Sequence, residues 1–273
     1  MSTLAALDWI IIAGYFLFVP LTGYPADGQV RELQRIVEAL ETKASLYEHQ
    51  QSRSVVTESA GRVPAKKKKL PPPGMPIYKP PRRGAPVGRV AGGTRGILDE
   101  YPSLLCVLAP NHTALTIQDQ PQLFWFLREL TSYPIELTLI EDQAIYPVLE
   151  TRLNTPVQPG IQAVRLADFG IYLEKEKIYK WFIAIVPDPD RRSKDILAWG
   201  AVRYLEISDE LRAKLLQFDK ITALNVYASA GIWYDAFAIL SELIRNSSGD
   251  VDLIIRRNAL LEQIGLLGIT KYQ

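Results

Sequence analysis

The sequence has few of the side chains that most often carry out catalysis or hold metal ions. Its 273 residues include one cysteine, two histidines and two methionines, and no Gly-x-Ser-x-Gly, His-Glu-x-x-His or phosphate-binding glycine loop occurs. The single cysteine, Cys106, excludes an internal disulfide and lies in an apolar run, where an inert buried thiol is expected. We therefore expect a binding protein rather than an enzyme, with no metal and no cofactor.

Positive charge is concentrated in one part of the chain. The net charge is +1, but residues 53–95 carry eleven Lys or Arg against one Glu, while residues 1–52 sum to −3 and residues 97–273 to −6. Residues 52–96 are also rich in Pro and Gly, which predicts an extended, semi-rigid linker. This basic linker either binds anionic lipid headgroups or is a solvated spacer. Nucleic acid is not expected, because no recognition helix or aromatic-basic platform accompanies the charge.

Residues 1–26 are expected to form an apolar helix that anchors or exports the protein. Residues 9–26 hold no charged side chain, and the length of this uncharged segment is at the lower limit for a helix that spans a bilayer. The only charge before them is Asp8, so an uncleaved anchor is favoured over a cleaved signal peptide. We expect a protein anchored in a membrane or exported to the periplasm or cell envelope, with the side of the membrane left open.

Residues 27–51 show the spacing of an amphipathic helix. Apolar side chains recur every three or four residues as a heptad seam, at Val30, Leu33, Val37, Leu40, Ala44 and Tyr47. Two interpretations fit this pattern. Residues 30–47 form a short coiled coil in a homodimer, or the helix lies on a membrane or on its own domain.

Residues 97–208 contain short apolar segments separated by turn residues about every ten positions. This pattern predicts an antiparallel, immunoglobulin-like β-sandwich. The strands are expected at residues 104–109, 113–118, 122–127, 135–141, 145–153, 160–166, 178–186 and 199–207. The segment 178–186 is apolar on both faces, so we expect it to lie in the middle of its sheet.

Residues 209–273 change to a helical period. Ser208 or Asp209 is placed to cap the first helix, and further helices are expected at about 220–230, from 232 onward and at 251–264. The spacing Tyr227-x-x-x-Gly231-x-x-Tyr234-x-Ala236 is similar to that of tetratricopeptide repeats. Fewer than two repeats cannot stand alone, so these helices should pack on the sandwich.

Two places are candidates for partner binding. The loop between the strands at 178–186 and 199–207 carries Asp188, Asp190, Arg191, Arg192 and Asp195, which must project into solvent. Trp233 and Tyr234 stand beside a helix turn, where aromatic side chains often make contact surfaces.

Two other functions remain open. Trp181 or Trp199 could stack on sugar rings in a glycan-binding sandwich, although aromatic residues in alternating strands are more often core residues. Glu141 and Asp142 could act as paired carboxylates in a hydrolase.

Several motifs together resemble the cyanobacterial family called domain of unknown function 928, over about residues 83–269. The resemblance implies a usually exported protein in which a β-sandwich precedes repeat-like helices, and it assigns no catalytic residue. The most specific motif is Gly231-Ile232-Trp233-Tyr234-Asp235-Ala236. The others are at residues 88–96, 122–127, 135–137, 159–161, 179–181 and 192–195.

Overall fold

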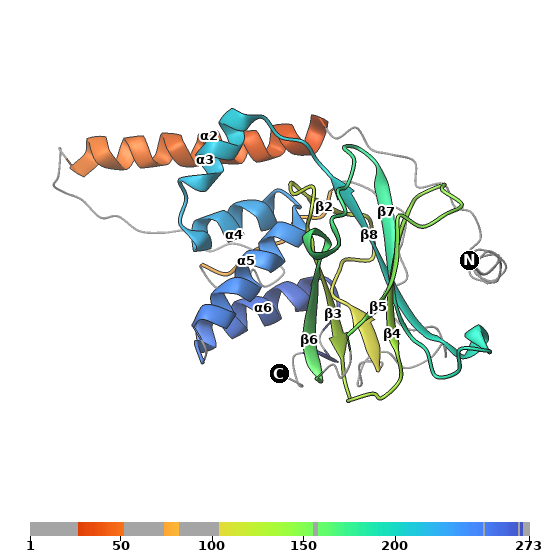
Figure 1. Cartoon of the computed structure of the whole chain (residues 1–273). Coiled ribbons are helices and arrows are strands. Elements are labelled where there is room, and N and C mark those ends of the chain that lie inside the picture. The colour runs from red at the N-terminus through yellow and green to blue at the C-terminus, as the bar shows by residue number, and fades with distance from the viewer. Residues whose placement is uncertain are drawn as a thin grey trace, which may run out of the picture.

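The computed structural model describes residues 27–51, 74–81, 104–154, 158–247, 249–266 and 268–269, with the backbone alone for residues 27 and 43–51. Two β-sheets lie on one side of the molecule and a layer of helices lies on the other (Figure 1). Within these residues no helix is both long and apolar enough to cross a membrane. The expected anchor at 9–26 and most of the expected linker lie outside the described residues.

All eight predicted strands are present. One sheet has the order β1-β3-β6 and the other the order β2-β8-β7-β4-β5. The first contains β1 (Leu105–Val107), β3 (Gln122–Leu127) and β6 (Gly160–Arg165). The second contains β2 (Ala114–Thr116), β4 (Ile135–Glu141), β5 (Leu149–Leu153), β7 (Ile178–Ile185) and β8 (Ile196–Tyr204). β5 begins later than predicted, after Pro147, which has no backbone N–H to donate to a ladder.

The expectation of wholly antiparallel pairing is wrong at one edge of the larger sheet. Strand β2 pairs with β8 in parallel, with Ala114 opposite Val202, whereas the other strand pairs are antiparallel. The two strands are far apart in the sequence, so no hairpin turn imposes the antiparallel direction. The chain is therefore mainly β with C-terminal helices, and its larger sheet is mixed.

Strand β7 lies in the middle of the larger sheet, as predicted, between β8 and β4. Its inner face carries Tyr179, Trp181, Ile183 and Ile185, each at most 2% exposed. Phe182 and Ala184 alternate with them on the outer face. Gly200 of β8 leaves room for the buried indole, since a Cβ there would stand 2.9 Å from Trp181 Nε1.

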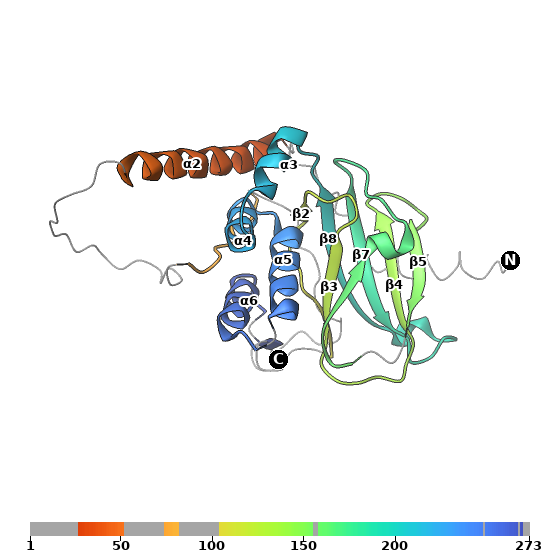
Figure 2. The same cartoon turned by 60° about the vertical axis from the view of Figure 1, so that its left-hand side comes forward.

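The helical layer begins where the sequence predicts it. Ser208 Oγ accepts a hydrogen bond from Leu211 N and caps α3 (Asp209–Leu216). Asp219 caps α4 (Lys220–Ser229) in the same way, and Asp250 caps α6 (Val251–Gln263). Between them, α5 (Trp233–Asn246) contacts β2 and β3, so the helices pack directly on the sheets, as Figure 2 shows.

Helix α2 (Asp27–Gln51) lies on its own chain. It contacts α3 and α4, and Leu33 and Val37 of the predicted seam are fully buried there. Lys214 Nζ of α3 also lies 3.2 Å from Glu41 Oε2. A homodimer through residues 30–47 stays a prediction, and it would require α2 to leave this position.

Part of the predicted linker is docked on the helices. Residues 74–81 lie beside α4 and α6, with Pro76 and Tyr78 buried. The sequence predicted an extended, semi-rigid linker over 52–96, and these eight residues of it are extended and seated on the helices. Their apolar side chains are too few to suggest packing in sequence, but here they fill a space between helices.

Candidate functional site

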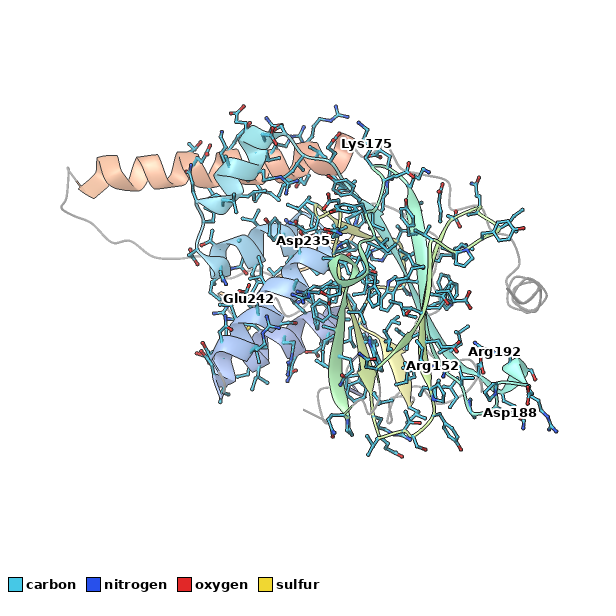
Figure 3. All side chains as sticks on the ribbon, in the orientation of Figure 1. Arg152, Lys175, Asp188, Arg192, Asp235 and Glu242 are labelled. Atoms are coloured by element: carbon cyan, nitrogen blue, oxygen red, sulfur yellow. The ribbon has the colours of Figure 1, made fainter. Side chains whose placement is uncertain are left out.

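The charged loop between β7 and β8 projects from one corner of the larger sheet, where Figure 3 labels Asp188 and Arg192. A short 3-10 helix, η2 (Arg192–Lys194), tightens the loop before β8 begins. Asp188 accepts a hydrogen bond from Asp190 N and pairs with Lys194 Nζ at 3.1 Å and with Arg191 Nε at 3.6 Å. The loop therefore has a defined shape held by its own charges.

Arg192 fixes this loop to the neighbouring strand. Its guanidinium lies 2.7 Å from Glu136 Oε2 of β4 and 2.9 Å from Asp195 Oδ2. The three side chains are only 22%, 15% and 9% exposed, respectively, so this ion pair is shielded from water. We call Arg192, Glu136 and Asp195, with the exposed loop residues Asp190, Arg191 and Lys194, the loop corner.

The exposed part of the loop corner is what a partner would meet. Asp190 is exposed, and the side chains of Arg191 and Lys194 are 70% and 50% exposed. Of the five predicted contact residues in the loop, Arg192 and Asp195 serve mainly as its base. Sequence reasoning missed Glu136, because only the pairing of β4 with β7 brings it to this corner.

The other predicted contact residues, Trp233 and Tyr234, are not at the surface. They are 0% and 1% exposed, which corrects the expectation that they form a binding surface. Trp233 Nε1 donates to Leu108 O at 2.9 Å, and the Tyr234 hydroxyl accepts from Trp181 Nε1 and donates to Ala201 O. Their aromatic bodies supply apolar area, and their polar atoms fasten α5 to both sheets.

The next residue of the same motif, Asp235, adds a further hydrogen bond between α5 and the sheets. It is 6% exposed, and its Oδ2 accepts a hydrogen bond from Ile117 N, just beyond β2. Figure 3 labels Asp235 where the helices meet the sheets. Burial raises the pKa of Asp235 to about 6, against hydrogen bonds from Thr116, Ile117 N and Gln118 that lower it. We call Trp233, Tyr234 and Asp235 the α5 junction.

The sequence itself carries a signal for the role of Asp235. It is the sole charged residue between Gly231 and Leu240 in an otherwise apolar stretch. A charged side chain is rarely buried without partners, so an acid in such a stretch predicts a specific hydrogen-bonded role.

The two tryptophans considered for sugar stacking have different environments. Trp181 is fully buried on the inner face of β7, so it is not available to a ligand, and that part of the expectation is corrected. Trp199 is half-buried on the outer face, where its ring stacks on Phe182 with centroids 5.9 Å apart. Of these two tryptophans, Trp199 is the one whose side chain is partly accessible to a ligand.

The carboxylates considered for hydrolysis are each paired with a lysine. Glu141 Oε2 lies 2.9 Å from Lys177 Nζ, and Asp142 Oδ1 lies 2.7 Å from Lys180 Nζ. These ion pairs engage the carboxylate oxygens that a general acid or a nucleophile would need to direct at a substrate. Among the described residues, no group of three or more His, Cys, Asp and Glu is placed to hold a metal ion.

Comparisons with known proteins identify a family but no activity. No curated protein matches the chain. Among solved structures, the chain is similar to "Structure of Astrotactin-2, a conserved vertebrate-specific and perforin-like membrane protein involved in neuronal development". The identity is 20%, the match covers 60% of this chain and 35% of that chain, and the TM-score is 0.26. The family model described as Domain of Unknown Function (DUF928) matches residues 90–273, and the chain therefore belongs to the DUF928 family.

Proposed function

We propose that this protein is a non-catalytic interaction module held at the cell envelope, and that the loop corner is its contact surface. The main support for this proposal is that some charged residues of the loop are shielded from water and others are exposed. A shielded Arg192–Glu136–Asp195 base holds its shape, and Asp190, Arg191 and Lys194 stand in solvent. A preorganised charged surface loses little conformational entropy on binding, which favours recognition.

The proposal includes the attachment and the finer architecture. Residues 9–26 and the basic linker bring the protein to a membrane. Residues 30–47 provide a homodimer contact once α2 leaves its position on α3 and α4. The two sheets form an immunoglobulin-like sandwich with one parallel edge pair, and α4 and α5 form a tetratricopeptide-like hairpin. The support is the contact of β1 with β8 across the sheets and the packing of α4 on α5.

A double charge reversal tests the contact surface. Arg191→Glu with Lys194→Glu should abolish capture of envelope proteins by the immobilised full-length chain and leave the melting temperature within a few degrees. Arg192 stays unchanged, because its removal would disturb the loop base. The matched control is Arg165→Glu with Lys175→Glu, whose side chains are 61% and 67% exposed and lie elsewhere. Equal loss of capture in both variants would show that net charge, not the loop corner, controls binding.

Trp199 favours glycan binding as a second candidate function. Its stack with Phe182 on the outer face of the larger sheet gives a rigid aromatic surface. If this function is correct, cell-wall polysaccharide should quench tryptophan fluorescence, and Trp199→Ala should remove the effect. Tyr172→Ala, at a 63% exposed aromatic elsewhere, is the control and should leave the quenching unchanged.

The proposal of a non-catalytic protein has its own test. Glycoside, ester and peptide substrates should not be turned over by the purified chain. Turnover that disappears in Glu141→Gln or Asp142→Asn, while both variants melt as the parent does, would replace both binding proposals by a hydrolase.

A further inference from the structure

Residues Gly74–Pro81 lie on the helical layer as an extended peptide lies in a receptor groove. Figure 1 shows this segment in orange, between α4 and α6. Its side chains alternate, since Pro76 and Tyr78 are buried while Ile77 and Lys79 point outward. This two-residue period is that of an extended backbone, in which one face is bound and the other is exposed.

The helices hold the segment chiefly by its backbone. The Gln263 side chain of α6 donates from Nε2 to Pro76 O at 2.9 Å and accepts at Oε1 from Tyr78 N at 2.8 Å. Lys79 N donates to Ala228 O of α4 at 3.1 Å, and Arg256 donates to Gly74 O. Backbone contacts of this kind, with pockets for alternate side chains, are a common way of recognising extended peptides.

Tyr78 is the anchor of the segment. It is 7% exposed, and its ring meets Trp233 edge to face with centroids 5.1 Å apart. Its hydroxyl lies 2.9 Å from His112 Nε2, so the polar end of the side chain also has a partner. A single buried aromatic with a hydrogen-bonded tip is the usual energetic centre of a contact.

Gly231 forms the floor of the groove. Its φ of +79° favours glycine, and a Cβ there would lie 2.8 Å from Lys79 O and 3.2 Å from Pro81 Cδ. Gly170 has a similar φ of +66°, but a Cβ there would meet nothing within 4 Å. Gly231 therefore permits a close approach of the segment in addition to a turn, and Gly170 permits a turn alone. We call this site, with its partners Gln263, Ala228 and Trp233, the segment groove.

We propose that the segment groove is an exchange site, in which residues 74–81 of a second copy of this chain replace the chain's own segment. The segment of a second copy has the same sequence as the segment already bound, so it can make the same contacts with the helices. The basic run at 53–95 carries +10 and residues 97–273 carry −6, which draws the linker of one copy toward the folded part of another. The helices at 209–273 sum to only −1, so charge brings two copies together and the backbone contacts then hold the segment. The 22 residues between Pro81 and Leu104 span at most about 80 Å, which permits exchange between neighbouring molecules.

The tether determines when exchange occurs. A segment joined to its own groove acts at an effective concentration of about 1 mM, so the chain keeps its own segment in dilute solution. Exchange becomes competitive when copies are crowded together or when one copy cannot use its own segment. This second condition can be imposed by mutation, which makes the proposal testable with full-length protein.

Two complementary variants provide the experiment. Tyr78→Ala removes the anchor and leaves the segment groove open, whereas Gly231→Ala blocks the groove and leaves the segment intact. Mixed in equal amounts, they should form a heterodimer, and capture of one tagged chain by the other should be at least tenfold above the control mixture. The control is Tyr78→Ala with Gly170→Ala, because Gly170→Ala carries similar backbone strain and keeps its own groove filled. A dimer through residues 30–47 would be equal in both mixtures and would cancel.

A second groove variant protects the test from misfolding. Gln263→Ala with Arg256→Ala removes the hydrogen bonds to the segment's backbone at an exposed and a half-buried position of α6, and should pair with Tyr78→Ala as Gly231→Ala does. Heterodimer levels equal to the control with both groove variants, each shown to melt cooperatively, would overturn the proposal. If a synthetic peptide of residues 72–83 bound Tyr78→Ala while no heterodimer formed, the second copy would also be ruled out, in favour of a different protein as occupant.

Discussion

The α5 junction and the loop corner are both built from polar side chains beside strand ends, but they differ in access to water. The three side chains of the α5 junction are at most 6% exposed, and their polar atoms bond to backbone or side chains of the sheets. In the loop corner the base is shielded and the outer charges are 50% to 70% exposed. Hydrogen-bonding side chains therefore hold layers together in the α5 junction, and charged side chains present a surface in the loop corner.

The largest effect should come from removing the helices α3 to α6, which the α5 junction holds on the sheets. A chain that ends at Ser208 loses α3 to α6 and exposes the apolar faces that α5 covers, so we expect insoluble protein. Expression in the soluble fraction followed by gel filtration checks this. A soluble truncated chain that melts cooperatively and keeps its β-sheet circular dichroism would show that the sheets form a core of their own.

A single substitution in the α5 junction should also be costly. Trp233→Ala removes a fully buried indole that stacks on Phe237 and donates to Leu108 O. We expect the free energy of unfolding to fall by about 3–5 kcal/mol, as measured by urea denaturation. Trp199→Ala, on the half-buried outer face, is the matched tryptophan control. If Trp233→Ala and Trp199→Ala lowered the free energy of unfolding equally, the burial of Trp233 would not explain its contribution to stability.

The α5 junction should make stability depend on pH. The pKa of Asp235 rises from near 3.9 in the unfolded chain to about 6 in the folded protein, so the folded state binds the proton more tightly. Its stabilising contribution is complete below about pH 4 and is lost as the pH rises through about 6. Relative to Asp235→Asn, the wild type should lose on the order of 2–3 kcal/mol between pH 4 and pH 7 in urea unfolding. A constant difference over this range would mean that Asp235 does not change its proton affinity on folding.

Two adjacent arginines sharpen the comparison within the loop corner. Arg192→Ala leaves the shielded carboxylates of Glu136 and Asp195 without their main partner and should cost about 1.5–3 kcal/mol in unfolding free energy. Arg191→Ala, at a 70% exposed side chain, should change stability by no more than about 0.5 kcal/mol. If the two variants lost the same free energy of unfolding, the shielded base and the exposed charges of the loop corner would not differ in their contribution to stability.

Local sequence information predicts the elements of this fold well. The strands at 122–127 and 135–141 have the predicted bounds, because alternation of apolar residues and turn residues both act within about ten positions. The helix starts at Ser208, Asp219 and Asp250 follow from side chains that bond to the backbone two or three residues on. The exposure of Asp190 and Arg191 was predicted from the charged stretch between two apolar strands, whereas the shielding of Arg192 and Asp195 was not.

The tertiary structure alone decided which aromatic and polar side chains are buried and what they touch. Trp233 meets the backbone 125 residues earlier, and Tyr78 is bound by Gln263, 185 residues later. The parallel pairing of β2 with β8 and the approach of Glu136 to Arg192 also depend on segments distant in sequence. Composition specifies that an aromatic residue gains free energy from burial, but the surface that covers it is set by how whole layers pack.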